Sequence, residues 1–151
     1  VAYESSSRTL NKGYNWCSVQ ASLYCYFPPA EQVVVTHLPS GMMYNGNLGG
    51  VSGADANCAA HFSGAKALLK TAGQWPVDVA TAGKFLRGDG TVIAHGWSEL
   101  LNGPSAAIRY QNPGASDVWT GADDNDCSGW TSAVGHPNGK GGMGVAYESS
   151  S

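Results

Sequence analysis

The chain begins and ends with the same seven residues, and this repeat limits how the chain can be organised. Residues 1–7 and residues 145–151 both read VAYESSS, an offset of 144 residues. An excerpt from a tandem array of 144-residue units has this pattern, and so does a circular permutation that opens new ends in a surface loop. A cloning artefact would produce it as well. In each case we expect a single domain over residues 1–151, with Val1 and Ser151 near one another at the surface.

The composition excludes several classes of protein. Charged residues make up only 13% of the chain, and the net charge is −3 with a pI near 5.7. There is therefore no basic surface for a nucleic-acid backbone. We find no apolar run of the roughly 18 residues that a membrane span needs and no signal peptide at the start of the chain. Because 42% of the residues are hydrophobic, we expect an ordered domain rather than a disordered segment.

The clearest periodic segment is 19–27, in which apolar residues alternate with more polar ones. This pattern predicts a half-buried strand. The residues of its apolar face are Val19, Ala21, Leu23, Cys25 and Phe27. Tyr24 and Tyr26 fall on the opposite face, where we expect an exposed aromatic stripe suited to a partner surface.

Other local signals predict an α+β fold with short, mostly antiparallel strands, one or two helices and long ordered loops. We expect a strand at 33–36, two strands around a Gly88-Asp89-Gly90 turn at 86–93, and one helical turn at 97–101. A helix should begin at a Ser52 N-cap, with Asp55 in its first turn, and end at Gly64. Segment 66–71 fits either a helix or a strand. Residues 102–144 are rich in turn-forming residues, so we expect loops there, with Trp119 and Trp130 as buried anchors.

Ordered loops of this length need covalent support, and the chain has four cysteines, Cys17, Cys25, Cys58 and Cys127. Four cysteines allow three pairings, and none of their spacings matches a CxxC metal or redox motif. Two structural disulfides and an oxidising compartment are the natural interpretation. The alternative is four buried thiols in a cytosolic protein.

Read as a circle from Val33, the chain shows a set of fragments in a recognisable order. These are Gly53-Ala54-Asp55 shortly before Cys58, Trp97 with Glu99-Leu100-Leu101, Val118-Trp119 with Gly121, Cys127 with Trp130-Thr131, and Cys17 and Cys25 with seven residues between them. In this order the chain resembles bacterial secreted and surface domains with the C-type-lectin-like fold, and more distantly the endostatin domain of collagens. The departure is that the family's closing segment, which ends in LYCYF, lies near the front of this chain.

The resemblance implies a fold, a disulfide pairing and a location outside the cell. The family's nested pairing would carry over as Cys25–Cys58 and Cys17–Cys127. C-type-lectin-like folds often bind calcium, and sugar through it, in long loops. A calcium ion takes six to eight oxygen ligands, and the densest set here is Asp117, Asp123, Asp124 and Asp126. The loop lacks the EF-hand alternation and the Glu-Pro-Asn triplet of sugar-binding C-type lectins, so a chain of Asx turns leading into Cys127 is the alternative.

Aromatic and amide side chains in polar surroundings are the other candidate ligand contacts. We single out Tyr44, Trp75, Tyr110 and Asn125, because aromatic faces on loops pack against the C–H groups of sugar rings. No catalytic motif is present: there is no G-x-S-x-G elbow, HExxH motif or P-loop, and no two histidines stand three or four residues apart as a helical zinc site needs. We therefore do not expect an enzyme.

These observations lead to one functional expectation and one alternative. The first is an extracellular binding or adhesion module that recognises a glycan or a matrix protein through its long loops, with calcium as a candidate cofactor. The alternative is a structural repeat unit of a self-assembling surface fibre, because a 144-residue period is natural in a tandem array.

Overall fold

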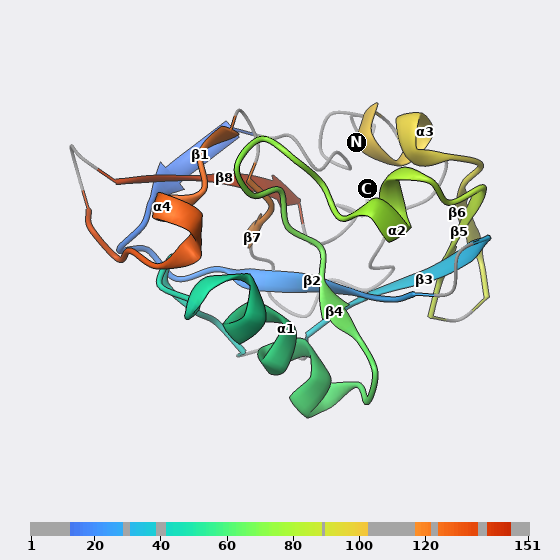
Figure 1. Cartoon of the computed structure of the whole chain (residues 1–151), viewed down its shortest axis with the longest axis horizontal. Helices are drawn as coiled ribbons and strands as arrows, with labels where there is room; N and C mark the ends of the chain where they lie inside the picture. Colours follow the sequence, from blue (N-terminus) through green and yellow to red (C-terminus); the bar gives the residue numbers. More distant parts are fainter. Residues whose placement is uncertain are drawn as a thin grey trace, which may run out of the picture.

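The computed structural model describes residues 13–28, 31–38, 42–88, 90–102, 117–121, 124–135 and 139–145. They form an α+β fold with few, short helices, as expected (Figure 1). The strands are β1 (Gly13–Trp16), β2 (Ser22–Phe27), β3 (Gln32–His37), β4 (Lys66–Ala67), β5 (Lys84–Arg87), β6 (Val92–Ala94), β7 (Asp117–Trp119) and β8 (Lys140–Val145). The helices are α1 (Gly50–His61), α2 (Val77–Ala80), α3 (Trp97–Asn102) and α4 (Cys127–Trp130). Within these residues, no helix combines the length and the hydropathy needed to cross a membrane.

One mixed sheet carries the fold, in the order β1-β8-β7-β2-β3-β5-β6. The pairs β2–β7 and β3–β5 are parallel, and the other pairs are antiparallel. Strand β2 lies at the centre: β3 pairs with one of its edges, while β7 and then β4 pair with successive parts of the other. The expectation of short, mostly antiparallel strands therefore holds for most pairs, and two parallel pairs join them.

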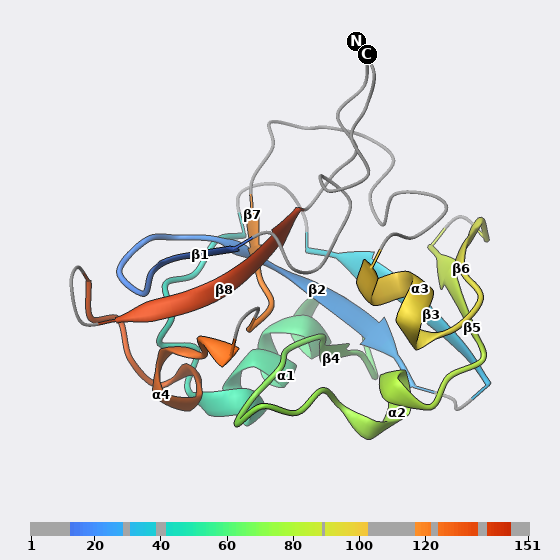
Figure 2. The same cartoon turned by 90° about the horizontal axis from the view of Figure 1, so that it is seen from above.

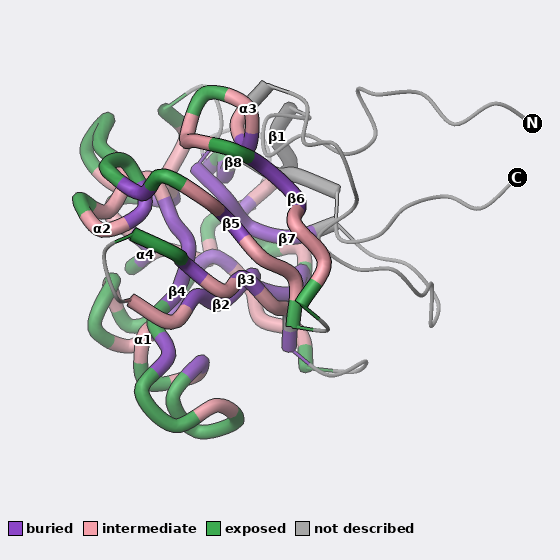
Figure 3. Tube along the Cα trace, turned by 90° about the vertical axis from the view of Figure 1, so that its right-hand side faces the viewer, coloured by how far each residue is buried: buried purple, intermediate pink, exposed green. Residues whose placement is uncertain are grey.

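The predicted aromatic stripe on β2 is wrong, because both faces of this strand are buried. Tyr24 is 1% exposed and Tyr26 is 2% exposed. The alternation itself is present. Leu23 and Cys25 belong to one core cluster, which includes residues of α1. The two tyrosines belong to a second core cluster with residues of β3, β5, β6, α2 and α3. Figure 2 shows α1 on one side of β2 and α3 on the other, and Figure 3 colours the central strands as buried.

Helix α1 begins differently from the prediction. Gly49 and Gly50 have φ angles of 82° and 78°, and the helix has no side-chain cap, so Ser52 is not the N-cap. Glycine accepts this left-handed backbone at little cost, and the first turn has no side-chain cap. Asp55 instead turns its carboxylate to another element, and its Oδ1 accepts a hydrogen bond from the Ala67 amide at 2.8 Å. The helix ends at His61, before the predicted stop at Gly64.

The hairpin at β5 and β6, the strand at β3 and the helical turn at α3 agree with their predictions. Residues 66–71 contain the short strand β4. Residues 102–144, for which we expected mainly loops, also contain the short elements β7 and α4 and most of β8. Strand β8 reads KGGMGV, and it pairs with both β1 and β7.

Two disulfides hold these elements together. Cys17–Cys127 joins the turn after β1 to α4, and Cys25–Cys58 joins β2 to α1. This is the pairing that the resemblance implies. Trp119 and Trp130 are fully buried, which confirms them as anchors. Val1 and Ser151 lie outside the described residues.

Candidate functional site

A groove of about 310 Å³ lies where α1, β4 and the segment leading into α2 come together. We call it the Trp75 groove. It is lined by Tyr26, Val51, Asp55, Lys66, Ala67, Leu69, Thr71, Gln74, Trp75, Pro76, Val77 and Asp78. Its volume is at the lower end of the range of about 300–1,000 Å³ that is usual for ligand sites.

Trp75 is held in place by a tight turn and by aromatic packing. The Thr71 and Gln74 backbones exchange hydrogen bonds of 2.8 and 3.0 Å, which closes the turn just before Trp75. The Trp75 ring then meets Trp97 edge-on, with 5.0 Å between ring centroids. Trp97 in turn contacts Phe85 of the buried core. Trp75 is therefore a half-buried, preorganised aromatic wall rather than a mobile surface ring.

An uncharged phenol and two carboxylates meet in this groove. Tyr26 comes from β2, Asp55 from α1 and Asp78 from the first turn of α2. Burial, followed by the negative charges of Asp78 and Asp55, raises the pKa of Tyr26 to about 12. The phenol is therefore protonated at any physiological pH. In the part of the chain that the structure describes, its hydroxyl has no hydrogen-bond partner.

The shifted pKa of Tyr26 predicts a loss of stability in alkali. An unfolded tyrosine ionises near pH 10, whereas the folded one resists ionisation until about pH 12. The unfolded state therefore binds fewer protons between these values, and the free energy of unfolding falls as pH rises through this window. We expect the fall to be about 2–3 kcal/mol larger in the wild type than in Tyr26→Phe. Urea unfolding of both proteins at pH 9 to 12 measures it, and parallel curves would contradict the placement of Tyr26.

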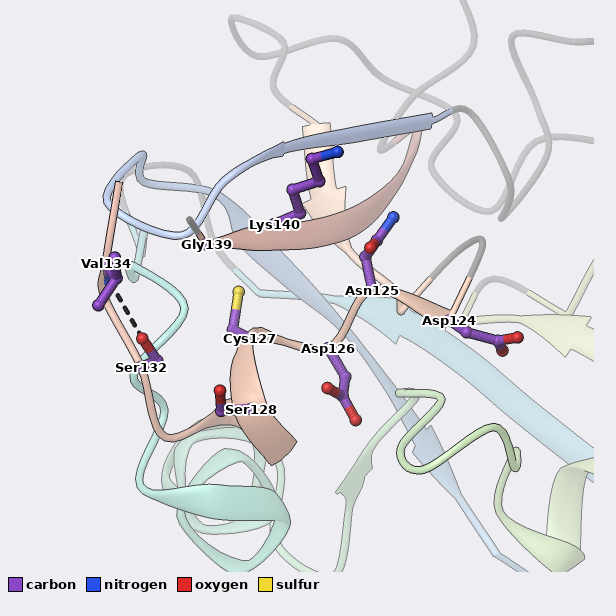
Figure 4. A pocket seen from close by; sticks show the side chains of 9 residues that line it. All are labelled: Asp124, Asn125, Asp126, Cys127, Ser128, Ser132, Val134, Gly139 and Lys140. Carbon is purple, nitrogen blue, oxygen red and sulfur yellow. Dashed lines mark hydrogen bonds between the residues drawn. The ribbon is translucent and has the colours of Figure 1, made fainter. Parts of the chain in front are cut away.

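A second pocket, of about 560 Å³, surrounds the loop before α4 (Figure 4). We call it the acidic-loop pocket. It is lined by Asp124, Asn125, Asp126, Cys127, Ser128, Ser132, Val134, Gly139 and Lys140. In Figure 4 the side chains of Asn125 and Lys140 project to one side of the loop, whereas Asp126 points the opposite way.

The described carboxylates of the acidic loop are engaged in structural contacts. Asp126 caps α4 by accepting a hydrogen bond from the Gly129 amide at 3.1 Å, and its other oxygen accepts one from the Ala72 amide at 3.0 Å. Asp124 forms an ion pair with Lys70, with 2.6 Å between Oδ1 and Nζ. These contacts tie the loop to residues 70–72, just before Trp75.

No group of three or more His, Cys, Asp or Glu residues that could hold a metal is found among the described residues. Asp123 and the side chain of Asp117 lie outside them. Calcium at the acidic loop therefore stays a prediction.

The structure distributes the other predicted ligand contacts over different places. Trp75 lines its groove and Asn125 lines the acidic-loop pocket. Tyr44 packs against the core cluster on the α1 side of β2, and its carbonyl accepts a hydrogen bond from Trp119 Nε1 at 2.7 Å. Tyr110 lies outside the described residues.

Sequence reasoning missed three residues that share the groove with Trp75. Asp78 stands only three positions after Trp75, so a carboxylate this close in sequence to an aromatic residue could have pointed to a shared site. Asp55 was assigned to a helix turn and Tyr26 to a surface stripe. Nothing local connects them, because strand β2 and helix α1 bring them to the groove.

The fold defines a disulfide-linked α+β domain with a mixed sheet. No family model, curated protein or solved structure matches this chain.

Proposed function

We propose that the chain is an extracellular binding module with a C-type-lectin-like fold, and that it binds a carbohydrate in the Trp75 groove. One observation carries the proposal: a half-buried tryptophan shares a groove with the carboxylates of Asp55 and Asp78 and the amide of Gln74. A sugar ring offers an apolar C–H face to an aromatic ring and hydroxyls to carboxylates and amides. A site of that composition fits both parts of the ligand.

Other features support this proposal. The two disulfides fit an oxidising compartment such as the cell exterior. Their nesting and the circular order of the sequence fragments support the C-type-lectin-like assignment. The acidic loop is the place where calcium would bind, and through Asp124 and Asp126 it holds residues 70–72 in position beside the groove. Calcium would then act by ordering residues 70–72. Calorimetric titration at millimolar calcium tests whether the ion binds.

Removing the aromatic wall should weaken glycan binding. We expect Trp75→Ala to reduce affinity for any glycan that the wild type binds by at least about tenfold, because the sugar loses its stacking surface. Trp75→Phe should retain much of the affinity, since a ring remains. A glycan array followed by isothermal titration calorimetry measures both.

The matched control is Val134→Ala, which alters an exposed residue of the acidic-loop pocket and leaves the Trp75 groove intact. It should bind as the wild type does. Unchanged binding by Trp75→Ala, or a wild-type protein that binds no glycan on the array, would remove the proposed function.

The pairing of the outer strands favours a second candidate, a structural repeat unit. Gly13 of β1 lies opposite Met143 of β8 in an antiparallel pair, so the chain enters and leaves this pair at neighbouring points. Adjacent entry and exit points suit a unit that repeats along a chain. Light scattering separates the candidates: a 15.6 kDa monomer supports the binding module, and concentration-dependent assembly into long polymers supports the repeat unit.

A further inference from the structure

We infer that the Trp75 groove selects an amino sugar, a glycan whose free amino group is protonated and enters between Asp55 and Asp78. This inference rests on the proposed carbohydrate binding and names the chemical class of the sugar. Four features of the groove support it: its two carboxylates, the Tyr26 hydroxyl, the Trp75 ring and the neutral side chains beside them.

The groove holds two carboxylates that have no counter-ion among the described residues, although Asp55 Oδ1 accepts a hydrogen bond from the Ala67 amide. Asp55 and Asp78 come from different helices, and both act on the same buried residue, Tyr26. Neither carboxylate forms an ion pair within the part of the chain that the structure describes. Lys66 also lines the groove, but it is exposed and pairs with neither of them. A ligand with a positive group would therefore gain two charge-assisted hydrogen bonds here.

The hydroxyl of Tyr26 supplies a third acceptor at the same place. This residue lines the groove although it is only 2% exposed, and the described residues give its hydroxyl no partner. The hydroxyl opens into the groove, where it can form a hydrogen bond directly with a ligand. An ammonium group has three N–H donors, and the groove offers three oxygen-bearing groups, Asp55, Asp78 and Tyr26.

The surrounding residues favour a sugar as the carrier of the amine. Trp75 provides a face for the ring and a favourable electrostatic contact with a nearby cation. Val51 and Val77, which are 39% and 75% exposed, extend the apolar rim. Thr71 and Gln74 add neutral hydrogen-bonding groups, which suit hydroxyls on the same ligand. A lysine side chain would leave these neutral groups unused.

The test compares two oligosaccharides that differ only at the amine. The ligands are a tetramer of β-1,4-linked glucosamine and its fully N-acetylated counterpart, titrated by calorimetry at about pH 5.5, where the free amine is protonated. We expect the free-amine tetramer to bind at least about tenfold more tightly than the acetylated one. This preference should shrink as salt is raised, because charge interactions are screened.

The decisive variant is Asp78→Asn, which removes one charge and keeps the size of the side chain. It should lower affinity for the free-amine tetramer by about tenfold and leave the acetylated tetramer unaffected. The control is Glu31→Gln, which makes the same change of net charge at an exposed residue outside the groove and should not alter the preference. Near-ultraviolet circular dichroism verifies that both variants are folded.

The outcomes separate this inference from the function on which it rests. Equal affinity for both tetramers, lost together in Trp75→Ala, overturns the amino-sugar inference and leaves carbohydrate binding standing. An equal loss in Asp78→Asn and Glu31→Gln also overturns it, because the preference would then come from net charge alone. If neither tetramer binds but a lysine-rich peptide does so in an Asp78-dependent way, both proposals fail.

Discussion

Replacing both Cys17 and Cys127 by alanine is expected to lower the free energy of unfolding by about 2–5 kcal/mol. The bridge spans 110 residues, so it restricts the unfolded chain strongly. It also joins the turn after β1 to α4. The glycines around it leave room for the sulfur and little else: a Cβ added at Gly46 or Gly141 would lie 2.4 or 2.7 Å from Cys127 Sγ.

The matched comparison is the alanine pair at Cys25 and Cys58, whose bridge spans only 33 residues. Both bridges are buried, so the packing losses are similar and the difference reflects loop length. The chain-entropy relation makes the shorter bridge less stabilising by up to about 1 kcal/mol. Urea denaturation monitored by tryptophan fluorescence measures both variants. A Cys17–Cys127 variant as stable as the wild type would contradict the expected role of this bridge.

Trp130→Ala should have an effect of similar size, a loss of about 3–5 kcal/mol. The side chain is fully buried, and its ring lies 5.9 Å from that of Trp119, centroid to centroid. Its Nε1 donates hydrogen bonds to the Lys70 carbonyl at 3.2 Å and to Thr71 Oγ1 at 3.1 Å. The substitution therefore leaves a cavity. It also removes the hydrogen-bond donor to Lys70 and Thr71, which precede Trp75 in the chain.

Trp130→Phe separates these two contributions. It keeps an aromatic ring in the core and removes the indole donor, so we expect an intermediate loss of about 1–3 kcal/mol. We also expect weaker glycan binding, because residues 70–71 help position Trp75. Chemical denaturation and calorimetry on the same protein measure both effects. If Trp130→Phe unfolds and binds like the wild type, the indole hydrogen bonds do not contribute as the geometry indicates.

Local sequence was sufficient for elements whose signals are contained in a few residues. The hairpin of β5 and β6 was predictable from its Gly88-Asp89-Gly90 turn, and β3 from its short apolar run. The strand around β2 was predictable from its alternation. Strand β8 was not, because Gly-rich KGGMGV has no apolar alternation. Gly141 serves close packing instead: a Cβ there would lie 2.6 Å from the ring of Trp119.

The burial of Tyr24 and Tyr26 could not be read from β2 either. Alternation shows which side chains share a face, but whether a face meets solvent depends on what covers it. Here Val79 of α2 and Leu100 of α3 pack in the same core cluster as the two tyrosines. The start of α1 shows the same limit on a smaller scale, since the helix begins at two left-handed glycines, before the expected serine cap.

The residues of the Trp75 groove were likewise only partly predictable from local sequence. Composition and local pattern identified a disulfide-bearing α+β domain and singled out Trp75, because these depend on residue types and short spacings. The presence of Asp55, Asp78 and Tyr26 beside that tryptophan depended on the packing of α1, α2 and β2 around the core. The charge of the groove arises from contacts between residues far apart in the chain, so the chemistry that it offers a ligand emerges only when the domain is folded.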